Sequence, residues 1–578
     1  MEPIQEAYAQ LCESHKGEEA IPLGYLQELL QKYLQSDGDE LLELDLRGIR
    51  FFQSREDIFA GPESLLHIGT DSPSGPKKVH IKNGTFDKVK GITVDDSAAT
   101  VEFSNMRLNT SGPVVEVSGS TVKLSKCWCS GRSAVFLAQG GAKVELVSCV
   151  LEKSKDGKGL VVRGAGTVVS VQDCQISDNK ERGICVSGGA EVKLNACRSN
   201  GSQLGEGMVV TDEGTKVEAQ KCRFLDNKLV GVLVKAGGVV KLTECKVNGS
   251  VTQEGMVVED AGSHAEGVEC DFSGNKSSGV SVRNKASADL LNCTSKHSST
   301  FFGLEARDRG SKLVAEGGDT SGNESSNVRV TKGGTAKLTG VICNGSIKGN
   351  GLVIRDADST AEVEDCDFSG CLHAGIFIQN GGRAKMKGCK TTKSKDYQGA
   401  IVRDQASMME ATDCLFSENP ESGIAVTEGG RVNLTQCKCL RSTDTHGLEA
   451  GGAGTIVDAT DCDFSENKSV GMFIDTGAFV RVKGCRMEKQ YQGIYVAGEG
   501  TNLQAEKCEV LGSQSTGILL NEGASVWLTE CVSKGSEEHV ALWVPEDSTI
   551  DARDCDFSEN CYSIEGADFA ETCYGCTF

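Results

Sequence analysis

Glycine recurs at a step of about 24 residues through most of the chain, a period typical of solenoids. The series runs through Gly159, Gly183, Gly207, Gly231, Gly255, Gly279 and Gly303 and, after Asn327, through Gly351, Gly375, Gly399, Gly423, Gly447 and Gly471. Within a copy such as 351–374, short alternating apolar runs are separated by Gly, Asp and Asn, and none is long enough for a helix. So short a unit cannot bury an apolar face alone, and the copies must therefore stack.

Three short strands in each copy make one rung of a parallel β-helix, so we predict an all-β solenoid of about 20 rungs. The residues one and three positions after each glycine are apolar, as in Leu352 and Ile354. Because side chains alternate along a strand, these two positions face the interior and the residue between them faces outward.

A cysteine follows most of the repeated glycines at a nearly constant distance, as Cys366 follows Gly351. The row comprises Cys149, in a looser copy, and Cys174, Cys197, Cys222, Cys245, Cys270, Cys293, Cys343, Cys366, Cys389, Cys414, Cys437, Cys462, Cys485, Cys508, Cys531 and Cys555. We interpret this cysteine ladder as small buried side chains in a reducing compartment. A disulfide or metal array is the alternative, although stacked parallel strands orient the Cβ atoms poorly for disulfides. We expect no cofactor and no bound metal. The three cysteines of the C-terminal segment lack an evident fourth ligand.

Alternate rungs differ, so the full repeat spans two rungs, or about 48 residues. Outward positions of the second strand alternate in charge from rung to rung, as in Lys241 and Glu266, then Lys385 and Glu410. Identical rungs would instead stack like charges on adjacent strands. Asn275 and its equivalents recur at a fixed position shortly after the cysteine, where we expect a corner with the backbone in the left-handed region.

The two ends depart from the repeat. We expect residues 1–40 to form an N-terminal helical cap, 41–90 to supply lead-in strands, 91–560 to form the parallel β-helix and 561–578 to cap the C-terminal end. The N-terminal segment is acidic and lacks a signal-peptide core, and the thiols are numerous, so we expect a cytoplasmic protein. Asn-x-Ser/Thr sequences such as those at Asn83 and Asn433 leave an extracellular location open.

The rung pattern over residues 76–578 resembles the right-handed parallel β-helix (pectin-lyase-like) superfamily. That superfamily includes polysaccharide lyases, glycosidases and polyuronate epimerases as well as non-catalytic binding proteins. The rung starts Gly375-Ile-Phe-Ile and Gly423-Ile-Ala-Val are similar to those in the β-helix of SHC-SH2-domain-binding and F-box-only proteins. This second resemblance implies a scaffold or recognition module.

The catalytic motifs of those enzymes are not found in the sequence. Asp95-Asp96 is the obvious acidic pair, but neither Gly-His-Gly nor Asp-Pro-His-Asp is present, and the eight histidines form no row. The best cationic row is Arg283, Arg307, Arg355 and Arg403, and Asp308, Asp356 and Asp404 directly follow three of these arginines. We assign no catalytic residue. The alternative function remains a polysaccharide lyase, hydrolase or epimerase, or a glycan-binding relative.

The outward position of the first strand is apolar in many rungs, which is unusual for a solvated face. We predict a partner-binding surface made of Val353, Phe377, Ile401, Phe473, Tyr495 and Leu519, with Arg355 and Arg403 at its rim. The expected partner is a protein or a second copy of the chain, and a polysaccharide is possible. A net charge of −22 argues against nucleic acid and anionic membranes. Coverage of the row by the chain itself is the alternative.

Overall fold

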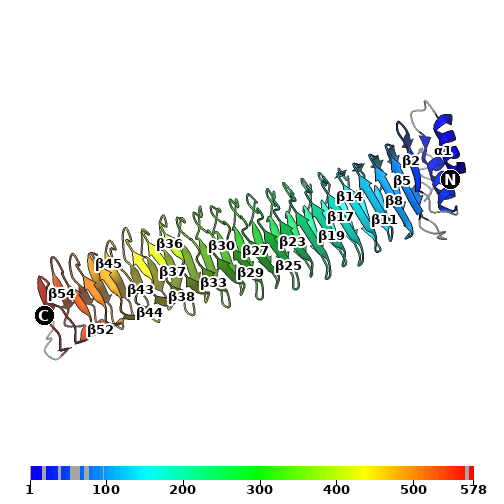
Figure 1. Ribbon diagram of the computed structural model, residues 1–578. Helices are drawn as coiled ribbons and strands as arrows, with labels where there is room; N and C mark the ends of the chain where they lie inside the picture. Colours follow the sequence, from blue (N-terminus) through cyan, green and yellow to red (C-terminus); the bar gives the residue numbers. More distant parts are fainter. Residues whose placement is uncertain are drawn as a thin grey trace. The chain divides into compact units, whose positions relative to one another are not determined.

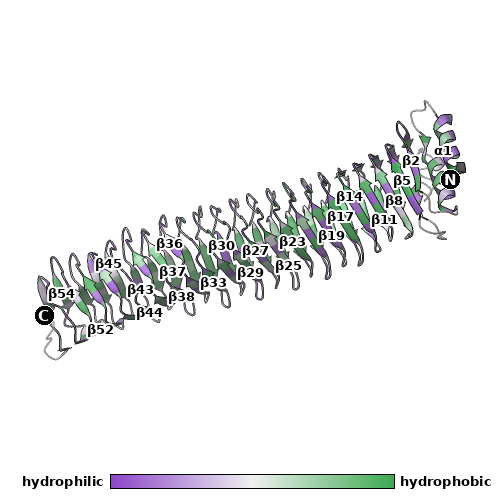
Figure 2. Ribbon diagram, in the orientation of Figure 1, coloured by the Kyte–Doolittle hydropathy of each residue, from purple (hydrophilic) through white to green (hydrophobic). Residues whose placement is uncertain are grey.

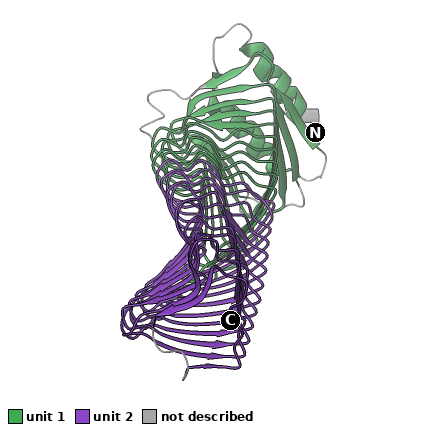
Figure 3. Cartoon of the chain, turned by 90° about the vertical axis from the view of Figure 1, so that its left-hand side faces the viewer, with its two compact units in different colours: residues 1–281, 285–289 green, residues 282–284, 290–578 purple. Residues whose placement is uncertain are grey.

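The computed structural model describes residues 2–15, 21–36, 41–52, 65–69, 77–95, 97–566 and 572–578. The chain divides into two compact units, shown in Figure 3: Met1–Ser281 with Lys285–Asp289, and Val282–Asn284 with Leu290–Phe578. Both units are parallel β-solenoids, and the chain contains about 21 turns, so the predicted fold class is confirmed. Neither of the two helices in the described part of the chain is long and apolar enough to span a membrane.

Each turn contributes to three parallel sheets, which we call sheets 1, 2 and 3 in chain order (Figure 1). In the second unit, β32 (Leu352–Arg355) lies in sheet 1 and pairs with the equivalent strands of the preceding and following turns. β33 (Thr360–Glu364) does the same in sheet 2. Sheet 3 is reduced here to a bridge at Asp367. Apolar and polar residues alternate along the strands (Figure 2), because one side of each strand faces the core.

The cysteine ladder occupies the corner between sheets 2 and 3. Cys366 is 1% exposed, and its thiol donates a hydrogen bond of 3.3 Å to the carbonyl of Glu364. The residue between them, Asp365, has a φ of 53°, which makes the corner a one-residue left-handed turn. Burial raises the pKa of Cys366 to about 12, so the thiol is protonated at neutral pH. The interpretation of the row as buried side chains therefore agrees with the structure.

The asparagine corner differs from our expectation. The left-handed residue is Gly274, with a φ of 66°, and not Asn275 itself. Asn275 is fully buried, and its amide joins two turns: Oδ1 accepts from the Ser250 N–H at 3.0 Å, while Nδ2 donates to the Val247 carbonyl at 3.0 Å. Asn179, Asn227, Asn323, Asn419 and Asn467 make the same pair of contacts to the preceding turn.

The two-rung repeat has a second cause besides the charges. At the corner between sheets 1 and 2, Asp356 accepts a hydrogen bond of 3.1 Å from the backbone N–H of Lys332 in the preceding turn. Asp404, two turns further on, accepts one of the same length from the N–H of Asn380. The charge alternation also forms contacts, because the Lys241 ammonium lies 2.8 Å from the Glu266 carboxylate. Turn chemistry and surface charge thus repeat with the same period.

Two helices cover the N-terminal end of the first unit. α1 (Glu2–Ser14) and α2 (Leu23–Leu34) present buried apolar residues, and α1 lies beside β2 in Figure 1. The Gln27 side chain bonds both backbone groups of His67, at 2.8 and 2.7 Å, on the open side of edge strand β4 (Leu65–Ile68). The Gln27 side chain thereby occupies backbone hydrogen-bonding groups of β4 that would otherwise be free to pair with another strand.

The strand pairing shows no break at the boundaries expected near residues 91 and 561. β2 (Leu41–Asp45) already pairs with β5 (Lys77–Lys82) in sheet 2. β56 (Tyr562–Gly566) likewise continues the pairing of sheet 1 beyond β54 (Val540–Val544). Both terminal segments therefore contribute strands to the solenoid.

Candidate protein-binding face

In three successive turns of the first unit, the outward row of sheet 1 is covered by the chain itself. Val209, Leu233 and Val257 are 3%, 8% and 0% exposed. They pack with Val230, which lies in the loop before β22 (Val232–Lys235), the strand that carries Leu233. Local coverage, the alternative to a binding surface, is therefore correct for this part of the row.

In the second unit the first predicted segment is partly open. Val353 is only 9% exposed, which contradicts its expected place on an open surface. Its neighbours in register, Phe377 and Ile401, are half-buried. The Arg403 guanidinium lies over the Phe377 ring at 5.0 Å from its centroid and donates a 2.8 Å hydrogen bond to the Gln379 side chain. Arg403 thus shields one face of the phenyl ring and leaves the remainder accessible.

Three arginines gather beside this segment. Arg307 and Arg355 stand two turns apart in register, with buried Thr331 between them, and Arg329 lies on the intervening strand. Burial lowers the pKa of Arg329, and repulsion from Arg355 adds to the effect. The nearest carboxylate to Arg329 belongs to Glu305, at 4.0 Å. The buried Nε atoms of Arg307 and Arg355 have no hydrogen-bond partner in the described part of the chain, although Arg307 Nε lies 4.0 Å from the Asp308 carboxylate. This arrangement favours an anionic group.

The second predicted segment forms a stack of rings. Phe473 on β45 (Val470–Asp475) stacks on Tyr495 of β48 (Gln492–Ala497), with centroids 5.0 Å apart and planes 8° from parallel. His446 stacks on the other face of Phe473 at 4.7 Å. Leu519 and Trp543 follow in register on the next two strands, and the Trp543 side chain is 38% exposed. We call these five residues the aromatic face.

Acidic groups adjoin the aromatic face. Glu449 is the neighbour of Phe473 in register, and its carboxylate accepts a 2.9 Å hydrogen bond from the Ser422 hydroxyl. Burial raises the pKa of Glu421, and the negative charge of Glu449 adds to this shift. Burial lowers the pKa of His446 to about 4, so the imidazole is neutral at pH 7 and stacks as an uncharged ring.

The sequence reasoning missed two members of the aromatic face. His446 directly precedes the repeated glycine Gly447, and Phe473 and Tyr495 each follow a repeated glycine by two residues. Their shared closeness to the repeated glycines is the signal that could have identified His446. Trp543 belongs to a copy without the glycine, in which Ala541 takes its place. Aligning that copy on Ala541 would have extended the outward row by one turn.

The arrangement of turns agrees with a comparison against protein-family models. The model described as right handed beta helix region matches residues 67–228, 115–267, 230–397 and 350–510. The chain belongs to the right-handed β-helix family. A search of curated proteins finds no match to this β-helix.

The residues considered for catalysis do not converge in this β-helix. Asp95 pairs with His67 at 2.6 Å, whereas Asp96 lies outside the described residues. Asp356 and Asp404 bond backbone N–H groups and act as turn residues. Within the described ranges, no group of three or more His, Cys, Asp or Glu side chains could hold a metal ion, and this includes Cys561, Cys573 and Cys576. The geometry therefore offers apolar and cationic contact surfaces.

Proposed function

We propose that this β-helix is a non-catalytic scaffold that binds another protein, or a second copy of itself, through the outer side of sheet 1 in the second unit. The observation that carries the proposal is the aromatic face, where Phe473, Tyr495 and Leu519 are only half-buried and form a continuous row with exposed Trp543. Large rigid side chains of this kind dominate the free energy of protein interfaces. Phe377, Ile401 and Arg403 extend the contact toward the arginines.

We further propose that the protein acts in the cytoplasm. The buried thiols of the cysteine ladder suit a reducing compartment. In addition, several of the asparagines in Asn-x-Ser/Thr sequences, such as Asn275, Asn323 and Asn467, are buried with their amides bonded. A glycan cannot be attached to such an amide in the folded state.

The arginine group favours a second candidate function. Arg307, Arg329 and Arg355 together could hold the carboxylates of an acidic polysaccharide on the same sheet. This candidate requires the arginines and leaves the aromatic face without a role, so the two functions predict different mutational effects.

The test compares Phe473→Asp, Tyr495→Asp and Phe377→Asp with Phe479→Asp as the matched control. Phe479 is also a half-buried outward phenylalanine, but it lies on sheet 2. Partners recovered from native extract are identified by mass spectrometry and then tested as purified proteins, with circular dichroism to verify folding. We expect the sheet 1 variants to weaken binding by about 100-fold or more, the equivalent of about 3 kcal/mol, and the control to bind normally.

A partner set that is unchanged in all three sheet 1 variants would show that the proposal is wrong. The second candidate is measured in parallel with oligogalacturonate and the variants Arg307→Ala and Arg355→Ala. If these changes abolish oligogalacturonate binding while Phe473→Asp leaves it intact, the carbohydrate function replaces the scaffold.

A further inference from the structure

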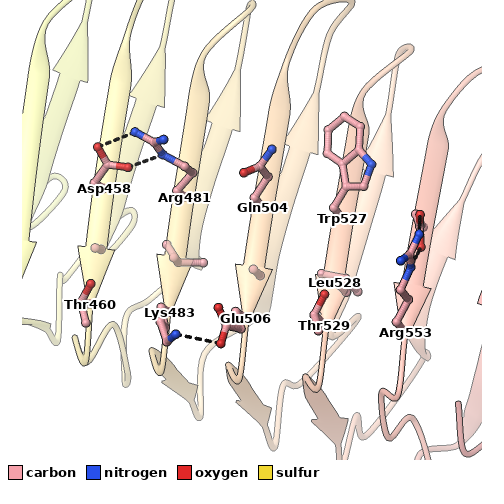
Figure 4. Close-up of a pocket in the computed structure, with 14 residues that line it drawn as sticks. Asp458, Thr460, Arg481, Lys483, Gln504, Glu506, Trp527, Leu528, Thr529 and Arg553 are labelled. Atoms are coloured by element: carbon pink, nitrogen blue, oxygen red, sulfur yellow. Dashed lines mark hydrogen bonds and ion pairs between the residues drawn. The ribbon is translucent and has the colours of Figure 1, made fainter. Parts of the chain in front are cut away.

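A shallow depression of about 600 Å³ lies on the outer side of sheet 2, close to the C-terminal end of the second unit (Figure 4). It crosses five successive strands: β44 (Ile456–Thr460), β46 (Phe479–Lys483), β49 (Asn502–Glu506), β52 (Ser525–Thr529) and β55 (Thr549–Arg553). One outward side chain from each strand forms its central row, which reads Asp458, Arg481, Gln504, Trp527 and Asp551. Because adjacent strands lie about 4.8 Å apart, the row makes a continuous surface.

The charges around the depression neutralise one another. Arg481 makes two hydrogen bonds to Asp458, one of them 3.0 Å long, and Arg553 makes two to Asp551, at 3.0 and 2.9 Å. The Lys483 ammonium lies 2.8 Å from the Glu506 carboxylate, and Figure 4 shows this pair beside the central row. Three cations therefore face three anions, and a charged ligand would gain no net attraction.

Two adjacent uncharged residues interrupt the charge alternation here, whereas the other breaks in this unit, at Val314 and Asn433, are single residues. In turns of the same unit, the row continues as Lys337, Glu362 and Lys385, whereas here it carries Gln504 and Trp527 side by side in register. The Trp527 side chain is 41% exposed. Neither its indole N–H nor the Gln504 amide has a hydrogen-bond partner among the residues that the structure describes. The indole N–H and ring of Trp527 and the side-chain amide of Gln504 are therefore available to a ligand at adjacent positions.

We propose that this depression binds a neutral sugar ring, a hexopyranose unit of a glycan. The axial C–H groups of a pyranose pack against an indole plate, and its hydroxyl groups exchange hydrogen bonds with an amide that both donates and accepts. The paired carboxylates and guanidiniums accept from and donate to further hydroxyls without requiring a charge on the ligand.

Other occupants fit the same groups less well. An acidic sugar would have to compete with Asp458 and Asp551 for the guanidiniums, and a cationic segment would have to compete with Arg481 and Arg553 for the carboxylates. A proline-rich peptide also packs on tryptophan, but its recognition uses an aromatic-lined groove. Here Trp527 is the single aromatic side chain among the residues that line the depression. The site lies on sheet 2, so it is independent of the function proposed for sheet 1.

The experiment titrates the full chain with cellohexaose, laminarihexaose, mannohexaose and hexagalacturonate, followed by calorimetry and by tryptophan fluorescence. Trp527→Ala and Gln504→Ala are compared with Trp128→Ala, a control that removes a half-buried tryptophan from sheet 3 of the first unit, on β12 (Trp128–Ser130). We expect at least one neutral hexasaccharide to bind, with a Kd of about 1 mM or tighter. Trp527→Ala should weaken that binding by at least about tenfold and Gln504→Ala by a smaller factor, while Trp128→Ala should bind as the wild type does.

Four results would overturn the proposal. The first is that none of the neutral saccharides binds to the wild-type chain. The second is that binding survives in Trp527→Ala or is lost in Trp128→Ala. The third is that hexagalacturonate binds through Trp527 as tightly as the neutral saccharides, which would show that the paired charges do not select the ligand. A peptide of repeated proline, titrated in the same way, tests the competing occupant, and its binding through Trp527 in place of a saccharide would also refute the proposal.

Discussion

Replacing Asn275 with alanine tests how the turns are held together. The Asn275 side chain is 0% exposed, and its amide serves two successive turns of the first unit. It accepts from the N–H of Ser250 at 3.0 Å and donates to the carbonyls of Val247 and Phe272, at 3.0 and 2.7 Å. Alanine removes all three contacts and leaves the backbone groups buried. We therefore expect the turn from 247 to 279 to lose stability before its neighbours do.

The magnitude follows from the number of groups that lose a partner. Each buried backbone group left without a hydrogen bond costs about 1–3 kcal/mol. For three groups the lower limit is about 3 kcal/mol, and we expect a value near that limit, because water entering the vacated space restores part of the bonding. Asn195→Ala is the control, since Asn195 is exposed at the end of β19 (Glu191–Asn195), and its expected cost is within about 0.5 kcal/mol.

Hydrogen exchange is the suitable measurement, because a stack of repeats opens locally and need not unfold in one step. In Asn275→Ala, the amides of residues 247–279 should exchange at least about 100-fold faster, which corresponds to about 3 kcal/mol, while amides before residue 200 keep their protection. If the free energy of opening of this segment changed by less than about 1 kcal/mol, the reasoning would be refuted, since the hydrogen bonds of Asn275 would then contribute little to stability.

Two further predictions concern the buried thiols and the ring stack. Cys366→Ser should lower the free energy of unfolding, measured by chemical denaturation, by about 1–3 kcal/mol, because a hydroxyl replaces a weakly polar thiol in a dry corner. Cys366→Ala should lower it by less. If Cys366→Ser left the free energy of unfolding unchanged and EDTA unfolded the protein, the row would instead be a metal array. His446 has its pKa lowered from 6.5 to about 4, so the unfolded chain binds the proton more readily than the folded chain, and stability is lost as pH falls through that window. The protection factors of residues 446–473, which are the observed exchange rates corrected for the intrinsic rate at each pH, should fall between pH 6.5 and pH 4 in the wild type and change less in His446→Phe. Equal pH dependence of the protection factors in both chains would contradict the assignment.

The repeat in the sequence was sufficient to determine the architecture. Leu352 and Ile354 flank an outward position. Because the repeat is so short, their side chains can be buried only against the neighbouring turns. The cysteine ladder and the charge alternation followed for the same reason, because a parallel stack places equivalent residues directly over one another. Periodicity of this kind is a property of the chain that needs no knowledge of loop conformation.

Exposure, by contrast, was decided only by the tertiary structure. Alternation correctly sends Val209, Val353 and Phe473 outward, but Val209 is covered by a loop valine and Val353 is nearly buried, whereas Phe473 stays accessible within a ring stack. The loops between sheets 3 and 1 do not follow the strict alternation of the strands, and the path of each loop determines which outward side chains of sheet 1 are covered. For the same reason the depression around Trp527 could not be foreseen, since it depends on arginines and carboxylates pairing with each other beside an unpaired amide.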